Sequence, residues 1–117
     1  MKHNQKIGKW GEQVAEEYLA KKGYIILEKN YRTPYGEIDI VASLDGLTVF
    51  VEVKTRTSRI FGLPEEAITK RKLTHMKSSA EYFAAIQKLD SWQCDAIAVE
   101  GKPGLSAQIE HFENVLI

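Results

Sequence analysis

Three carboxylates and one ammonium group occupy alternate positions in two segments that otherwise have the pattern of buried β-strands. Glu37 and Asp39 alternate with apolar residues in 36–41, and Glu52 and Lys54 do the same in 49–54. Because successive side chains point to opposite faces of a strand, each pair projects from one face. Clustered carboxylates of this kind hold divalent cations, and an ammonium group beside them can stabilise developing negative charge.

The two segments are joined by Asp45-Gly46, a pair typical of the two-residue type I′ hairpin turn, in which both residues have positive φ. That turn places Asp39 opposite Glu52 and Glu37 opposite Lys54, with all four side chains on one face of the hairpin. Two carboxylates directly opposite each other repel. The arrangement therefore requires a counter-cation, and a divalent metal ion fits best.

The alternative is an ordinary solvated surface on which Glu37 and Lys54 form a cross-strand ion pair. Such a surface would be polar along its whole length. The same face also carries Val41 and Phe50, which predicts that a helix covers part of it. We therefore favour a functional site at the edge of that cover.

The order of these residues resembles that of a nuclease superfamily. An acidic residue on a first helix, Asp on a strand and Glu-x-Lys on the next strand are similar to the PD-(D/E)xK pattern. The fuller pattern resembles the YraN family of small bacterial proteins, predicted nucleases similar to archaeal Holliday junction resolvases. The resemblance covers nearly the whole chain, through Gly8-x-x-Gly11-Glu12, Gly23-Tyr24, Asn30-Tyr31-Arg32, Gly36-Glu37-Ile38-Asp39, the segment 50–56, Phe61-Gly62, Lys72 and His111-Phe112-Glu113-Asn114.

Two positions depart from the pattern. The Pro that names the superfamily is absent before Asp39, as is usual in the YraN family. Near the fourth strand, where family members tend to carry Arg, an aromatic residue and Asp, this chain has Gln93-Cys94-Asp95. An arginine role at that place is therefore not carried over.

The resemblance implies a restriction-endonuclease-like α/β fold, with residues 1–117 forming one domain around a mixed, mostly five-stranded sheet flanked by helices. It also implies a metal-dependent endonuclease that cleaves DNA, with branched DNA as the expected substrate. Oxygen ligands favour Mg²⁺ or Mn²⁺ over zinc. In this mechanism Asp39, Glu52 and the Val53 carbonyl hold the metal, and Lys54 orients the attacking water or balances charge on the phosphate.

Two glutamates complete the expected catalytic set. Glu12 lies at the flank of the apolar stripe of the first helix, where a carboxylate is more often merely solvated. The family resemblance is what assigns it to catalysis. Gly8 and Gly11 beside it would let the helix approach the sheet closely. Glu37 is expected to hold Lys54 or a metal-bound water.

Basic residues are concentrated in one part of a chain whose net charge is zero. Residues 54–77 have a balance of +5 and residues 78–117 a balance of −4, as expected if one surface meets phosphates. We expect Arg56, Lys70, Arg71 and Lys72 to contact nucleic acid. The last three stand in the expected first turn of the second long helix, where free amides would also bind a phosphate. The alternative is a helix that starts earlier, near Pro64, with these cations in mid-helix on a solvated face.

Hydrophobic periodicity predicts the order helix, three strands, helix and two strands, and 117 residues with 44% hydrophobic content suffice for one core. The expected elements are a first helix ending at Gly23, strands over 24–31, 36–41 and 49–54, a helical turn at 64–66, a helix over 69–87, and strands over 94–100 and 107–112. We read His111 as structural, near the end of the last strand.

The cysteine usage and the N-terminus bear on where the protein works. Cys94 is the only cysteine and cannot form an internal disulfide, and its strand context favours a buried thiol in a reducing compartment. The charged residues 1–6 are not typical of a signal peptide or a membrane span. We therefore expect a cytoplasmic protein.

Two other classes of function and the oligomeric state stay open. One class is a nucleic-acid-binding module that keeps the fold without turnover, against which the intact Asp39 and Glu-x-Lys pattern counts. The other is a structural interaction protein, favoured only by the zero net charge. Cleavage of two symmetric strands of a junction would require a homodimer.

Overall fold

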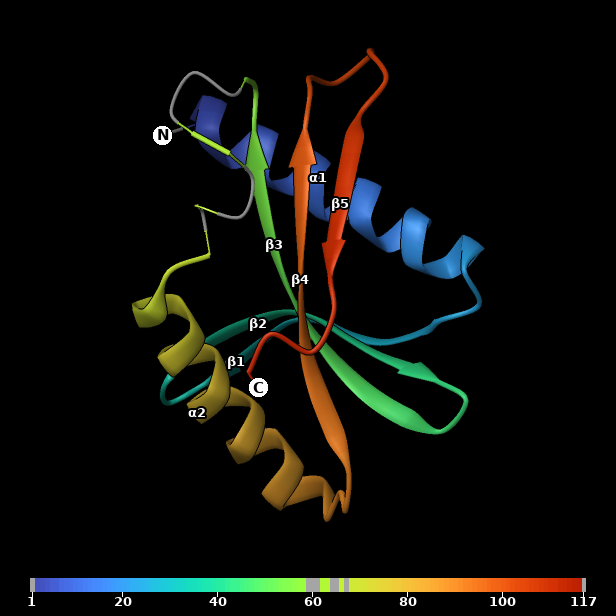
Figure 1. Ribbon diagram of the computed structural model, residues 1–117, viewed down its shortest axis with the longest axis vertical. Helices are drawn as coiled ribbons and strands as arrows, with labels where there is room; N and C mark the ends of the chain where they lie inside the picture. Colours follow the sequence, from blue (N-terminus) through green and yellow to red (C-terminus); the bar gives the residue numbers. More distant parts are fainter. Residues whose placement is uncertain (1, 59–61, 64–65, 67, 117) are drawn as a thin grey trace.

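The fold is a twisted five-stranded sheet with α1 on one face and α2 on the other (Figure 1). The computed structural model describes residues 2–58, 62–63, 66 and 68–116, with side chains from residue 6 onward. The elements are α1 (Lys2–Lys21), β1 (Ile25–Thr33), β2 (Gly36–Leu44), β3 (Leu47–Arg56), α2 (Lys70–Gln87), β4 (Trp92–Glu100) and β5 (Gln108–Phe112). The strands lie side by side in chain order. Neighbouring strands are antiparallel except β3 and β4, which are parallel and are connected through α2, so the predicted mixed sheet is confirmed.

The predicted hairpin turn and helix ends are confirmed. Asp45 and Gly46 have φ values of 50° and 86°, as a type I′ turn requires. α1 ends at Lys21 and is followed by the left-handed Gly23 (φ 96°), after which the Tyr24 amide donates to the Leu19 carbonyl at 3.0 Å. Among the described residues, no helix has the length and apolar character needed to cross a bilayer.

The second long helix begins where the expected first turn places it. Thr69 has extended backbone angles, and its side chain accepts the Lys72 amide at 3.2 Å, which is an N-cap. α2 therefore starts at Lys70, and the alternative start near Pro64 is wrong. The helical turn predicted at 64–66 falls outside the described residues, except for Glu66.

Two apolar clusters hold the helices against the sheet. On one face, Ala15 and Leu19 of α1 pack with alternate residues of the strands, including Val51. On the other face, Phe83 of α2 packs with Phe50, at 5.4 Å between ring centroids. The helical cover predicted for the Phe50 face is therefore confirmed. The buried free thiol predicted for Cys94 is also confirmed.

One predicted face assignment is wrong. The strand alternation predicts Ile38 and Ile40 on the same apolar face, but Ile38 packs in the α2 cluster while Ile40 packs in the α1 cluster. Between these two residues, the regular alternation of β2 side chains between the two faces of the sheet is broken. On β1, Asn30 lies between the partners of these two residues and has a φ of 51°, so both strands of the hairpin are distorted at this level. Figure 1 shows β1 and β2 bending away from β3 near the middle of the molecule.

Candidate functional site

The predicted carboxylates lie where β2 separates from β3. The hydrogen-bonded ladder between these strands ends at Ile40 and Val51, and beyond it the Val53 amide donates to Asp39 Oδ2 at 2.8 Å. The predicted pairing of Asp39 with Glu52 in the ladder is therefore wrong. The Val53 amide, which points toward β2, bonds to the Asp39 side chain and not to the β2 main chain. The two strands diverge from this point. Because the N–H and C=O of one residue point to the same side of a strand, the Val53 carbonyl faces the same opening.

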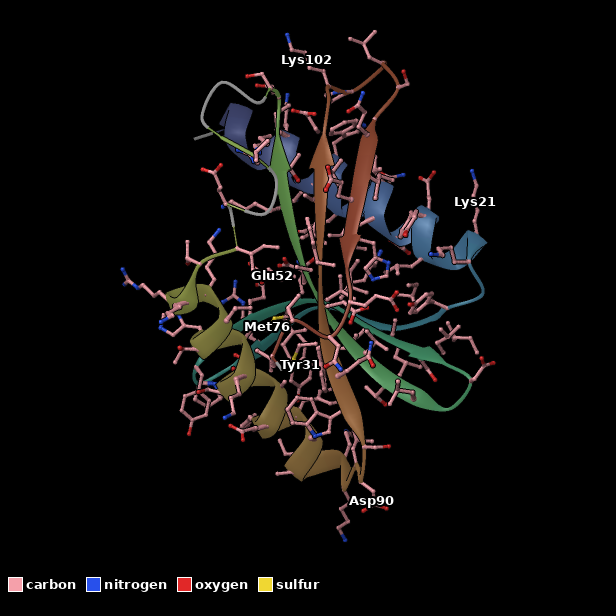
Figure 2. The ribbon with its side chains drawn as sticks, in the orientation of Figure 1. Lys21, Tyr31, Glu52, Met76, Asp90 and Lys102 are labelled. Carbon is pink, nitrogen blue, oxygen red and sulfur yellow. The ribbon has the colours of Figure 1, made fainter. Side chains whose placement is uncertain are left out.

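Asp39 nevertheless lies close enough to Glu52 for that carboxylate to raise its pKa. Burial and then the nearby Glu52 carboxylate raise the pKa of Asp39 to about 7, although its carboxylate accepts the Val53 amide. Burial also raises the pKa of Glu52, against the attraction of Lys72 and Lys54. Figure 2 shows Glu52 near the middle of the molecule, between the two helices. The two acids are thus partly buried and repel each other, with incomplete compensation from cations.

Lys72 belongs to this group, which the sequence did not indicate. Burial and then the hydrogen bond and repulsion of Lys54 lower the pKa of Lys72 to about 8, while Glu52 and Asp39 oppose the shift. Two ammonium groups therefore lie together beside the two acids. The two basic residues that precede Lys72 are placed differently. Lys70 lines a separate hollow with Thr74, and Arg71 is exposed.

The first helix brings Glu12 to the opening, with a glycine at the point of closest approach. A methyl group at Gly11 would collide with the side chain of Thr55 on β3, so α1 lies directly on the strand there. The predicted close approach is confirmed for Gly11. It is wrong for Gly8, where a methyl group would meet nothing within 4 Å, because Gly8 lines an open hollow with Glu12 and Lys54.

Asn30 is a site residue to which sequence reasoning gave no role. Its side-chain amide donates to Glu12 Oε1 at 2.9 Å and to Glu37 Oε1 at 3.1 Å, so one donor group joins α1 to β2. Glu37 also lies 3.8 Å from Arg32 Nε across the β1–β2 pair, and it has no place opposite Lys54 in the β2–β3 ladder. One signal was present, because Asn is disfavoured within strands and adopts positive φ more readily than most residues.

Hollows on both sides of the sheet reach these residues. One of about 490 Å³ is lined by Glu12, Asn30 and Asp39, on the side of α1. A second hollow, the α2 cleft, has about 180 Å³ and is lined by Tyr35, Gly36, Glu37, Glu52, Lys72, His75, Met76 and Ser79. A ligand can therefore approach the carboxylates from either side of the opening.

Arg56, the remaining predicted nucleic-acid ligand, is placed differently from the lysines. It is partly buried at the end of β3, two residues beyond the exposed Lys54. Its Nη2 atom is buried, with no hydrogen-bond partner in the part of the chain that the structure describes. Arg56 therefore does not present a freely exposed guanidinium group to a ligand.

The donor set fits a hard divalent cation through a pair of carboxylates. Within the described ranges, no three His, Cys, Asp or Glu side chains converge closely enough to hold a metal ion as a group. Asp39 and Glu52 with the Val53 carbonyl provide three oxygen donors from two side chains and one main-chain group. Mg²⁺ commonly takes only one or two carboxylates and keeps several waters, and a set of two carboxylates lies within that range.

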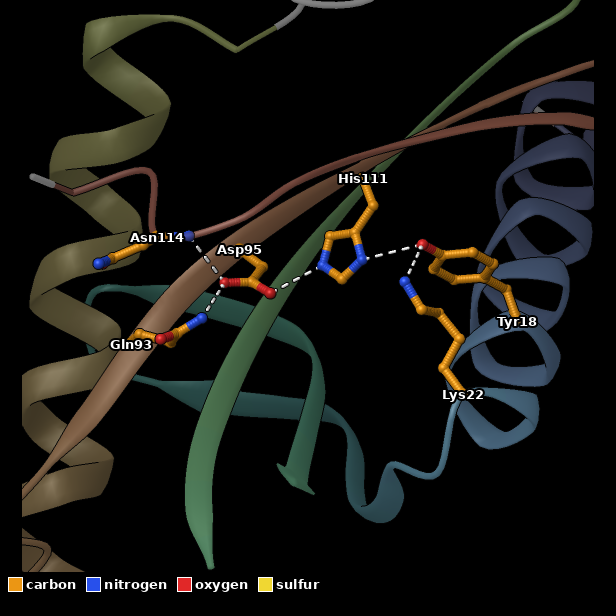
Figure 3. Close-up of polar contacts among 6 residues, drawn as sticks. All are labelled: Tyr18, Lys22, Gln93, Asp95, His111 and Asn114. Atoms are coloured by element: carbon orange, nitrogen blue, oxygen red, sulfur yellow. Dashed lines mark hydrogen bonds and ion pairs between the residues drawn. The ribbon is translucent and has the colours of Figure 1, made fainter. Parts of the chain in front are cut away.

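A second polar network lies apart from the carboxylates and is structural (Figure 3). Asp95, fully buried on β4, is 2.7 Å from His111 Nε2 and accepts the Asn114 amide and the Gln93 side-chain amide, each at 2.9 Å. The other ring nitrogen of His111 is 3.1 Å from the Tyr18 hydroxyl on α1. The network joins α1, β4, β5 and the turn that follows, which confirms the structural reading of His111.

The sheet order, the flanking helices and the acids at the opening between β2 and β3 fit the restriction-endonuclease-like class of α/β proteins. The chain belongs to the family described as "Uncharacterised protein family UPF0102", whose model matches residues 11–99. This is the YraN family, so the resemblance predicted from the sequence is confirmed. It is 46% identical over 118 residues to a UPF0102 protein of Trichlorobacter lovleyi, covering 97% of this chain and 91% of that protein. It is 56% identical over 77 residues to one of Syntrophomonas wolfei, covering 66% of this chain and 67% of that protein. A relative from Syntrophotalea carbinolica is 43% identical over 108 residues, 91% of this chain and 87% of the relative.

Proposed function

We propose that the protein is a Mg²⁺- or Mn²⁺-dependent endonuclease that hydrolyses phosphodiester bonds in DNA, with branched DNA as the expected substrate. The observation that carries this proposal is the pair of partly buried acids, Asp39 and Glu52, whose pKa values are both raised. Repelling carboxylates cost stability unless a cation joins them. A pair of acids whose repulsion is only partly compensated by cations, and which open hollows reach, is typical of a functional site.

Asp39, Glu52 and the Val53 carbonyl would hold the cation, with Glu12 close enough to Asp39 to raise its pKa further. A bound Mg²⁺ or Mn²⁺ supplies a Lewis acid for the phosphate and a water of lowered pKa. Asn30 fixes the carboxylates of Glu12 and Glu37 relative to each other through its amide. The acids are therefore oriented by contacts within the protein itself.

The lysines supply positive charge where the phosphate would lie. Lys54 projects from β3 two residues after Glu52, and Lys72 reaches the same place from the first turn of α2. Two adjacent ammonium groups repel, and an anion between them relieves that repulsion. Lys54 would orient the attacking water or balance the charge that develops on the phosphate in the transition state. Lys72 would hold the phosphate itself.

DNA beyond the scissile phosphate would lie over the first turn of α2. Lys70 and Arg71 are exposed there, on the helix terminus whose dipole favours anions. Cleavage at both strands of a junction would need two such sites, which favours a homodimer for that substrate. A cytoplasmic location accords with this substrate and with the single reduced cysteine.

The test is cleavage of labelled junction, flap, nicked and single-stranded DNA in Mn²⁺. Wild type should cut at least one substrate, Glu52→Gln should lose both metal binding and cleavage, and Lys54→Ala should lose cleavage while metal binding and fold are kept. Lys102→Ala, an exposed lysine in the β4–β5 loop, is the matched control and should cut like wild type. Wild type that binds branched DNA but cuts none of the substrates in any divalent metal would instead favour a DNA-binding module.

A further inference from the structure

An exposed aromatic ring lies at the rim of the α2 cleft. Tyr35, in the turn between β1 and β2, is 56% exposed and lines this cleft together with Glu37, Glu52 and Lys72. Its ring meets Tyr82 of α2 edge to face, with centroids 6.4 Å apart and planes at 67°. The same hollow therefore joins the proposed catalytic groups to a large aromatic surface open to solvent.

The turn that carries Tyr35 is fixed to α2. Thr33 Oγ1 lies 2.9 Å from the hydroxyl of Ser79, which is 1% exposed, and 2.7 Å from the Gly36 carbonyl. The same oxygen accepts the Tyr35 amide at 3.1 Å. These contacts order the turn in the free protein. A ligand that stacks on Tyr35 would therefore lose little free energy in ordering it.

The part of α2 that borders the cleft matches a short stretch of nucleic-acid strand in length. Lys72, His75 and Ser79 line it at successive turns of α2, and Tyr82 follows one turn further. Lys72 and Tyr82 are separated by about 15 Å along the helix axis, which is about the length of four stacked nucleotides. A strand whose phosphate lies at Lys72 can therefore place a nearby base at the Tyr35 ring.

A base can stack on a protein ring only when its own face is uncovered. In an intact duplex both faces of each base are covered by neighbouring pairs, so a base must be unpaired or extruded to reach a side chain. Aromatic side chains that bind single strands stack on such bases with little regard to sequence. We propose that Tyr35 stacks on an unpaired nucleobase and so selects DNA with an unpaired nucleotide within about four nucleotides of the scissile phosphate. This inference rests on the proposed function and narrows its substrate to flaps, forks and branch points.

The test compares binding to a flap and to a fully paired duplex of equal length, in Mn²⁺ and in a Lys54→Ala background that does not cut. Tyr35→Ala should weaken binding to the flap by about 5- to 150-fold, the range for loss of one base–aromatic stack, and change duplex binding less than about twofold. Tyr35→Phe should keep the preference, and Tyr35→Leu should lose most of it. Leu105→Ala, which removes an exposed side chain of the β4–β5 loop, is the control and should change neither.

A fluorescent base gives a second readout. 2-Aminopurine placed at the unpaired position should be quenched on binding to the Lys54→Ala protein and stay bright with Tyr35→Ala added. Equal losses on flap and duplex, or no loss on either, would overturn the role of Tyr35 and leave the nuclease proposal standing. A different result is also possible: wild type cuts no substrate in any divalent metal, yet flap binding still depends on Tyr35. It would support the stacking site and refute the nuclease.

Discussion

Replacing Asp39 by Asn should stabilise the metal-free protein at pH 8 and leave its stability nearly unchanged at pH 4. Burial and Glu52 raise the pKa of Asp39 from 3.8 to about 7 in the fold. Well below pH 3.8 the carboxyl is protonated in the folded and the unfolded chain alike. As the pH rises from 4 to 7 the unfolded chain loses this proton first, so the folded state of wild type loses stability over that range.

The size of the effect follows from the shift. About three pKa units at roughly 1.4 kcal/mol each give about 4 kcal/mol, and this is an upper value because water reaches part of the side chain. The amide that Asp39→Asn introduces is neutral at every pH, and its oxygen can still accept the Val53 amide, so the fold keeps that hydrogen bond. At pH 8 the variant should therefore exceed wild type in free energy of unfolding by up to about 4 kcal/mol.

The assay is urea unfolding with a chelator present, at intervals between pH 4 and 8. Asp45→Asn is the matched control, because it removes an exposed carboxylate from the hairpin turn at a position where Asn tolerates the positive φ. It should change stability by less than about 0.5 kcal/mol throughout. Millimolar Mn²⁺ should narrow the gap at pH 8 by stabilising wild type. A difference between wild type and Asp39→Asn that is constant across the range would refute the electrostatic strain assigned to Asp39.

Five further substitutions, in three tests, probe other parts of the structure. Lys72→Ala should weaken DNA binding equally across sequences and lower the slope of log affinity against log salt by about one unit, and an unchanged slope by fluorescence anisotropy would place Lys72 away from the phosphates. Gly11→Ala should cost about 1 to 3 kcal/mol in urea unfolding through collision with β3, whereas Gly8→Ala should gain up to about 1 kcal/mol; equal effects would contradict the close approach of α1. Asp95→Ala should cost about 3 to 5 kcal/mol because it leaves buried partners unpaired, whereas Tyr18→Phe should cost only about 1 kcal/mol; similar costs would contradict the network in Figure 3.

The elements of this fold follow from local chemistry that the sequence displays. The Asp45-Gly46 turn, the left-handed Gly23 and the alternation of β3 each depend on a few neighbouring residues, and all three are as predicted. The register set by that turn also brings Asp39 near Glu52, although the two residues are not paired in the ladder. Such features are predictable because the backbone preferences of single residues and the two-residue period of strands determine them.

The divergence of β2 from β3 could not be read from the alternation. A regular hairpin places Ile38 beside Ile40, but the Val53 amide bonds to the Asp39 side chain instead of to β2, and the strand changes its facing. Competition between a side-chain acceptor and the ladder is decided by the tertiary structure. The same holds for Lys72, because only the packing of α2 on the sheet shows which cation of its first turn faces Glu52.

Whether Asp39 and Glu52 share a divalent cation is tested most directly by calorimetric titration of Mn²⁺ at pH 7, in two buffers of different ionisation enthalpy. Metal binding releases the proton that the carboxyl holds, and with a pKa of about 7 for Asp39 the expected release is about half a proton per ion bound. Asp39→Asn and Glu52→Gln should lose the binding, and Asp45→Asn should keep it. Isotherms for Asp39→Asn and Glu52→Gln that match wild type, in both buffers, would contradict a metal site between the two carboxylates.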